Sequence, residues 1–105
     1  SGANLVDSNL SEVKLIGADL TAASLTRANL KYANFLAAKT QNTAVRMTNL
    51  IGVSSLNEDQ LAAFFGDSTT LLPDGMVRPA HWQQYETDLE FYRAWRAAKK
   101  EAGLP

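Results

Sequence analysis

A leucine or an equivalent residue returns at every fifth position through the first half of the chain. The row reads Leu5, Leu10, Leu15, Leu20, Leu25, Leu30, Phe35, Thr40, Val45, Leu50. A small or β-branched residue stands two positions before each member: Ala3, Ser8, Val13, Ala18, Ala23, Ala28, Ala33, Ala38, Thr43, Thr48. An amphipathic helix needs apolar spacings of three and four, and a half-buried strand needs alternation, so a period of five fits neither. A fixed short period instead predicts a solenoid, in which each unit packs on the next.

The period of five also predicts which residues face inward. If each unit turns the chain by about a quarter, four units close one square coil. The large residue and the small residue two positions earlier then point inward together, because alternate residues of extended backbone share a side. Small polar residues such as Asn9 and Asp19 stand between them, and pairs such as Thr21-Ala22 or Lys31-Tyr32 are expected to face solvent.

The five-residue units resemble a known family signature. The units Ala3-Asn4-Leu5, Ala18-Asp19-Leu20, Ala28-Asn29-Leu30 and Ala33-Asn34-Phe35 resemble the A(D/N)LXX motif of the pentapeptide-repeat family. The match covers residues 3–52, with departures at Lys14, Lys39-Thr40 and Ala44-Val45. The resemblance implies an all-β solenoid with a right-handed quadrilateral β-helix, of which the ten units would form about two and a half coils. Thr40 is expected to mark a weaker or locally adjusted coil.

The second half predicts two helices. The first is expected from Glu58 to Phe65, with Asn57 or Ser55 as its N-cap and Gly66 as its stop. On it Leu61, Phe64 and Phe65 are expected to share one face that covers the last coil. The second helix is expected from Gln83 to about Ala102, after a loop-like segment at 67–82. We therefore divide the chain into a pentapeptide-repeat β-helix at residues 1–53 and a helical cap and extension at residues 54–105, which pack as one structural domain.

The two ends of the predicted solenoid differ. Solenoids need a cover at each end, and the C-terminal half can supply one. The repeat is already in phase at Gly2, so the N-terminal coil is expected to be uncapped. Such an edge presents free N–H and C=O groups that invite pairing. We interpret the chain either as the C-terminal part of a longer repeat protein, which we prefer, or as a homodimer joined through this coil.

Composition limits the chemistry of the chain. It has 105 residues, which fit one small domain, and no cysteine for a disulfide or a thiolate. His81 is the only histidine, so a histidine metal cluster and a histidine-based triad both lack partners. Asp7, Glu12 and Asp19 are expected on different faces, and the glycines form no phosphate-binding loop. We therefore expect no catalytic residue, metal, cofactor or small-molecule substrate, and hence no enzyme. Without a leader or an apolar run of about 18 residues, the cytoplasm is the default localisation.

An aromatic and basic group in the second half is the candidate interaction surface. Tryptophan, tyrosine and arginine are enriched at interface hot spots, and Arg93 and Arg96 lie nearby. The alternative is that these aromatic residues pack the second helix onto the cap and the flank of the coil. Because adjacent helical residues cannot both face one core stripe, one of Phe91 and Tyr92 is expected to contact a partner or a second protomer. The candidate residues are Arg78, Trp82, Phe91, Tyr92 and Trp95.

These observations favour a non-enzymatic structural or protein–protein interaction module, with a protein partner or self-association. The family resemblance supplies an alternative, a DNA mimic that inhibits a type II topoisomerase. The charges of this chain oppose that alternative. Residues 3–52 carry three acids and five bases, a net charge of +2, whereas a DNA mimic needs a negative face. The five bases are scattered and form no basic stripe, so we expect no nucleic-acid binding, and no segment indicates a membrane.

Overall fold

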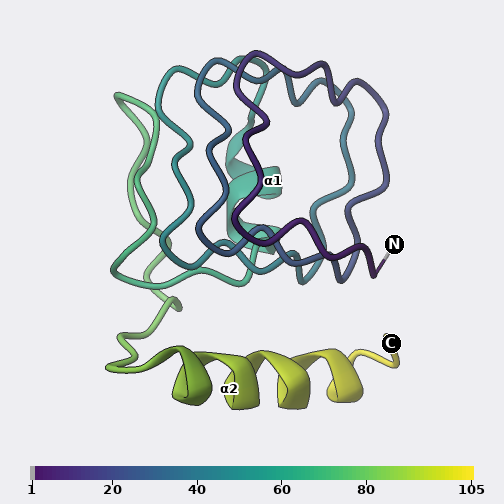
Figure 1. Cartoon of the computed structure of the whole chain (residues 1–105), viewed down its shortest axis with the longest axis vertical. Helices are drawn as coiled ribbons and strands as arrows, with labels where there is room; N and C mark the ends of the chain where they lie inside the picture. The colour runs from purple at the N-terminus through teal and green to yellow at the C-terminus, as the bar shows by residue number, and fades with distance from the viewer. Residues whose placement is uncertain (1) are drawn as a thin grey trace.

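The computed structural model describes residues 2–105, and residues 2–54 of it form a coil of parallel β contacts. Bridged residues lie 20 positions apart, so each turn of the coil holds four five-residue units. The bridges are Asn4–Ser24, Asn9–Asn29, Lys14–Asn34, Asp19–Lys39, Ser24–Ala44, Asn29–Asn49 and Asn34–Ser54. Successive turns lie side by side in Figure 1. Within the described residues the contacts are isolated bridges and not continuous strands.

A polar residue that most units carry helps the coil to turn. The second corner residue of every unit has a positive φ, from 52° at Asn42 to 76° at Gly52. The residue three positions earlier often carries a side-chain oxygen, and this oxygen accepts a hydrogen bond from the amide two positions on. Asn29 accepts from Lys31 N at 3.1 Å, and Asp19 accepts from Thr21 N at 3.0 Å. Asparagine and aspartate make this local bond readily, which stabilises the left-handed corner. The family motif is therefore a turn signal as well as a core signal.

The leucine row fills the inside of the coil, as the sequence predicts. Leu25, Leu30, Phe35 and Leu50 are fully buried, whereas Leu5, Leu10 and Leu15 of the first turn are half-buried. Thr40 keeps its place in the row at 3% exposure, and its hydroxyl donates to Gln60 O at 2.7 Å. Its polar group is thus satisfied at the end of the coil.

Helix α1 (Glu58–Ala63) covers that end, visible through the coil in Figure 1. Asn57 is its N-cap and forms a reciprocal capping box with Gln60, which confirms the predicted start. The Gln60 side chain also donates to Phe35 O and Ala38 O at 2.8 and 3.0 Å. Leu61 is buried in the coil's core.

The helix ends two residues earlier than the sequence predicts, and this changes where Phe65 points. Phe64 is already extended, and Phe65 bridges to Ala44 in the coil. Since alternate residues of extended backbone face opposite sides, Phe64 enters the core while Phe65 faces outward. The rings of Phe35 and Phe64 meet edge to face at 6.0 Å. The prediction that Phe65 shares a face with Leu61 and Phe64 is therefore wrong.

After α1 the chain follows the coil for a further irregular turn, with bridges from Leu71 to Asn49 and from Gln83 to Asp67. Helix α2 (Asp88–Glu101) then runs along one side of the coil as a separate layer (Figure 1). It begins five residues after the predicted start at Gln83, because Thr87 is the N-cap and accepts from Glu90 N. Neither helix in the described chain has the length and apolar character to cross a membrane.

Candidate interaction surface

Helix α2 lies on a side of the coil whose outward residues are small in the second and third turns. This side, here called the α2 face, contains the stacked residues Asn4, Ser24, Ala44 and Phe65. In the second turn the corresponding outward residues of the other three sides are Asn29, Asn34 and Lys39. Longer side chains at positions 24 and 44 would hold a helix away from the backbone. The departure of Ala44 from the repeat motif therefore makes room for α2.

Two aromatic residues of α2 fill the space against this face. Phe91 and Trp95 are 3% and 6% exposed and pack on Ala44. The Phe91 ring lies 5.2 Å from that of Phe65 and 5.5 Å from that of Tyr85, both edge to face. Trp95 Nε1 donates to Asn42 O at 2.8 Å. Burial of each ring contributes about 1.5–3 kcal/mol, so these two residues hold most of α2 in place.

A network of charged groups fixes the N-terminal end of α2. Arg46, with a side chain 7% exposed, donates to Asp67 at 2.6 Å and to Asp88 at 2.7 Å. Arg27 donates to Asp88 as well and to Asp7 at 2.9 Å. Asp88 thus receives bonds from two turns of the coil. The network compensates the cost of burying Arg46 and Asp67, since each charged group has several partners.

The network shifts the pKa values of its members in the expected directions. Hydrogen bonding to Arg46, and then to Arg27, lowers the pKa of Asp88 against the opposing effect of desolvation. Burial lowers the pKa of Arg46, but its hydrogen bonds to Asp88 and Asp67 outweigh this and leave it raised. Hydrogen bonds to Asp7 and Asp88 raise the pKa of Arg27. Both arginines and Asp88 therefore stay charged at neutral pH.

The five candidate residues do not form one exposed surface. Phe91 and Trp95 face the coil, and Tyr92, 49% exposed, is the member of the adjacent pair that faces solvent. Trp82 is half-buried, and its Nε1 donates to Phe64 O at 3.2 Å. Its ring lies against Gly66, where an added Cβ would come within 2.5 Å of it. Arg78 donates to Asp67 O and Thr70 O at 2.6 and 2.9 Å.

The five candidate residues leave out one exposed residue beside Tyr92, although its helical spacing is visible in the sequence. Leu89 is 56% exposed, on the first turn of α2. Its spacing from Tyr92, Arg93 and Arg96 is three, four and seven residues, which is the signal that places all four on one side of a helix. The side of α2 turned away from the coil is therefore both apolar and basic.

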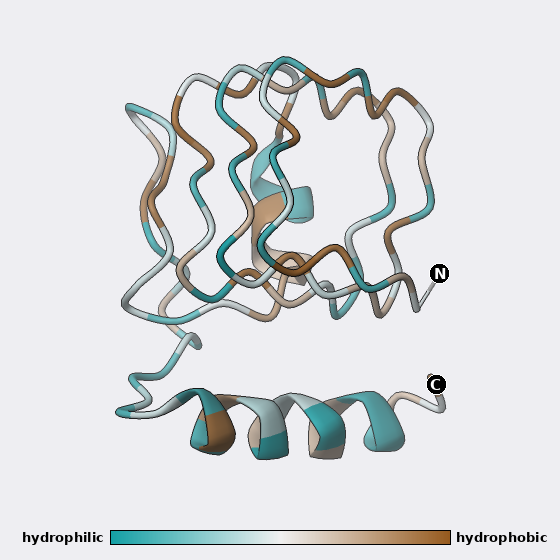
Figure 2. Ribbon diagram, in the orientation of Figure 1, coloured by the Kyte–Doolittle hydropathy of each residue, from teal (hydrophilic) through white to brown (hydrophobic). Residues whose placement is uncertain are grey.

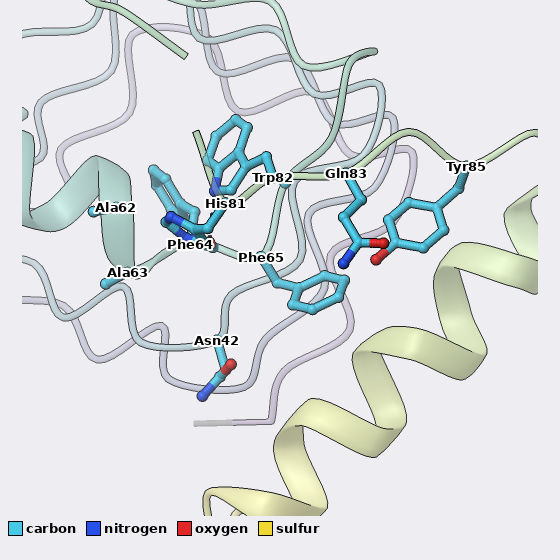
Figure 3. Close-up of a pocket in the computed structure, with 10 residues that line it drawn as sticks. Asn42, Ala62, Ala63, Phe64, Phe65, His81, Trp82, Gln83 and Tyr85 are labelled. Carbon is cyan, nitrogen blue, oxygen red and sulfur yellow. Dashed lines mark hydrogen bonds between the residues drawn. The ribbon is translucent and has the colours of Figure 1, made fainter. Parts of the chain in front are cut away.

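A hollow of about 160 Å³ lies where the end of α1 meets the segment that follows His81 (Figure 3). Asn42, His81, Gln83 and Tyr85 contribute polar groups to its wall, and Phe64, Phe65 and Trp82 contribute rings. Burial, and then the charge of Asp67, raises the pKa of Tyr85, so its hydroxyl stays protonated. Across residues 2–105 no three histidine, cysteine or acidic residues are grouped to hold a metal ion.

Comparison with known proteins agrees with the repeat pattern. Residues 3–36 match the model of a family described as pentapeptide repeats, in 8 copies. Among solved structures, the pentapeptide repeat protein Rfr23 from the cyanobacterium Cyanothece 51142 is 39% identical with a TM-score of 0.63. The match covers 69% of this chain and 48% of that one, so the chain spans about half the length of Rfr23. A search of curated proteins found no match. The similarity implies a β-helix, and with these repeats the chain belongs to the pentapeptide-repeat proteins.

Proposed function

We propose that the chain is a non-enzymatic protein-interaction module, in which the coil is a scaffold that presents α2 to a protein partner. The observation that carries this proposal is the α2 face. Ser24 and Ala44 make room for the helix, and Arg27 and Arg46 bind Asp88 at its first turn. These contacts with the coil, here called the docking site of α2, use one side of the helix and leave Leu89 and Tyr92 in solvent.

The docking site of α2 stabilises a helix that is short. A helix of 14 residues is marginally stable alone in water. Docked through Phe91, Trp95 and Asp88, it is ordered before a partner arrives. A partner then binds without the entropic cost of folding the helix. The coil suits this role because no buried side-chain nitrogen or oxygen among the described residues lacks a hydrogen bond.

The finer architecture is part of the same proposal. We infer a right-handed quadrilateral β-helix of about two and a half turns at residues 1–53, supported by the 20-residue bridges and by the similarity to Rfr23. Residues 54–105 would form its helical cap and extension in one domain, since Leu61 and Phe64 belong to the coil's core. The topoisomerase-inhibitor alternative gains no support from this geometry, because the repeats carry more bases than acids.

The test is affinity capture from a native lysate with two matched variants. Tyr92→Ala removes an aromatic side chain that is 49% exposed on α2, and Tyr32→Ala removes one that is 60% exposed on the coil. We expect one protein to be recovered near stoichiometry by the unmodified chain and by Tyr32→Ala, and to be lost with Tyr92→Ala. Recovery of nothing above background, or equal recovery by all three baits, would refute the proposal. Circular dichroism checks that both variants fold.

A further inference from the structure

The outer side of α2 carries a continuous row of exposed side chains, here called the α2 stripe: Leu89, Tyr92, Arg93, Arg96 and Lys100. Their spacings of three and four residues place them on one side of the helix. That side lies opposite Phe91 and Trp95, which face the coil. Figure 2 shows the hydrophobic colour of α2 concentrated in its first turn and hydrophilic colour along the later turns.

The α2 stripe contains three cations and no carboxylate. At about 100° per residue, Glu90 and Glu101 lie roughly a quarter to a third of a turn away from Leu89, off the stripe. Asp88 points to the coil, where Arg27 and Arg46 bind it. Within residues 2–105, the ion pairs involve Arg27 and Arg46 but none of Arg93, Arg96 and Lys100. Arg93, Arg96 and Lys100 therefore form no direct ion pair along about two turns of helix, and Glu90, three residues before Arg93, is the carboxylate of α2 nearest to the start of this row.

A groove of about 180 Å³ runs beside the stripe, between α2 and the coil. Tyr92, Phe91 and Trp95 line it from the helix, and Val6, Ser24 and Thr26 line it from the first two turns of the coil. The ion-paired side chains of Arg27, Arg46 and Asp88 complete its wall. Tyr92 belongs to both the groove and the stripe. An apolar side chain of a partner can therefore enter the groove while the partner's charged groups lie along the stripe.

We infer that the α2 stripe binds an acidic amphipathic helix of a partner protein, an inference that rests on the proposed function. Carboxylates at spacings of three and four would pair with Arg93, Arg96 and Lys100, and one apolar side chain would enter the groove beside Tyr92. Charge complementarity selects this occupant. The three cations span only about two turns of helix, whereas nucleic acid and anionic membranes are extended polyanions that bind broader basic surfaces, and the chain as a whole has a net charge of −1. The local row of cations matches a short acidic segment.

The experiment measures fluorescence anisotropy with a labelled peptide of about 15 residues, made of Glu, Ala and Leu and long enough to form helix. Its counterpart has every Glu replaced by Lys. We expect the acidic peptide to bind and the basic one not to bind, with the affinity falling as NaCl is raised. The double variant Arg93→Ala/Arg96→Ala should weaken binding by about tenfold. The matched control Lys14→Ala/Lys39→Ala removes two exposed lysines of the coil and should leave the affinity unchanged.

Three results would overturn this inference. One is no binding of the acidic peptide at millimolar concentration. Another is equal binding by the Arg93→Ala/Arg96→Ala variant. The third is tighter binding to phosphatidylglycerol vesicles or to duplex DNA than to the acidic peptide at the same salt. Failure here is distinct from failure of the proposed function. A lysate partner that depends on Tyr92, together with no binding of the acidic peptide, rejects only the acidic occupant.

Discussion

Replacement of Asp88 by asparagine should loosen α2 while leaving the coil intact. The carboxylate of Asp88 accepts from Arg46 at 2.7 Å and also from Arg27, on two different turns of the coil. Asparagine keeps the size of the side chain but removes its charge, so both bonds to guanidinium groups weaken. Asp88 is also the first residue of α2, where a negative charge favours the helix dipole.

The exposure of Asp88 and of its two arginine partners sets how much free energy the substitution removes. A hydrogen bond to a charged group contributes about 1.5–3 kcal/mol when it is shielded from water. The Asp88 side chain is 56% exposed, so the pair with Arg46 is worth roughly 1 kcal/mol after screening, and the more exposed pair with Arg27 adds a few tenths. With the loss at the helix terminus, Asp88→Asn should destabilise the docked helix by about 1.5 kcal/mol.

Native-state hydrogen exchange followed by NMR measures this local stability. A loss of about 1.5 kcal/mol raises the opening equilibrium of α2 by roughly tenfold, so its amides should exchange about ten times faster. Amides of the second turn of the coil, such as those of Leu25 and Leu30, should keep their rates. Glu90→Gln is the control, because it also removes an acid from the first turn of α2 but no ion pair. Unchanged exchange in Asp88→Asn, or equal acceleration in the coil, would refute the role given to this network.

The remaining predictions concern pH, the core of the coil and the packing of α2 on the α2 face. The folded pKa of Asp88 is lowered, so its stabilising contribution is present above its unfolded pKa of about 3.9 and is lost as pH falls through the folded value. The protection of α2 amides, measured relative to the intrinsic exchange rate at each pH, should therefore fall below about pH 4 in the unmodified chain and change less in Asp88→Asn. Leu30→Ala should lower the free energy of unfolding by about 2–5 kcal/mol in a urea titration, and Leu10→Ala by clearly less, because Leu30 is fully buried and Leu10 half-buried. Ala44→Asn restores the usual outward residue of the repeat on the α2 face and should displace the helix. Loss of Trp95 burial, read from its fluorescence in a Trp82→Phe background, with unchanged melting of the coil would verify this, and an undisturbed emission maximum would disprove it.

The coil was predictable because its causes are local and repeated. Each unit carries its own inward leucine and, in most cases, its own turn-forming oxygen, so the period alone indicates the fold. The start of α1 was predictable for a similar reason, since Asn57 and Gln60 form a cap within one turn. The end of α1 was not predictable in this way. The helix ends before Phe65 because Phe65 pairs with Ala44 in the coil. The two residues are 21 positions apart, and no local sequence pattern indicates that they pair.

The candidate surface was harder to predict because its geometry depends on contacts across the fold. Arg46 meets Asp67 and Asp88 at separations of 21 and 42 residues, and nothing adjacent to these residues marks the pairing. An aromatic stripe at helical spacing shows that a helix has two sides, but it does not show which side meets the coil. The small residues of the α2 face decide which side of the helix meets the coil. Phe91 and Trp95 face inward and Tyr92 faces outward.

Departures from the repeat motif indicate where another segment packs on the coil. Asn29 and Asn49 show the usual outward residue, a side chain that bonds its own corner and faces water. Ser24 and Ala44 are both smaller, they stack on one another in successive turns, and α2 covers them. The turn-forming oxygen is missing at Ala44, where the corner residue Arg46 instead bonds Asp67 and Asp88. Replacement of the outward asparagine by smaller residues in consecutive turns of the same side therefore indicates where a segment outside the repeats docks, and in this chain that segment is α2.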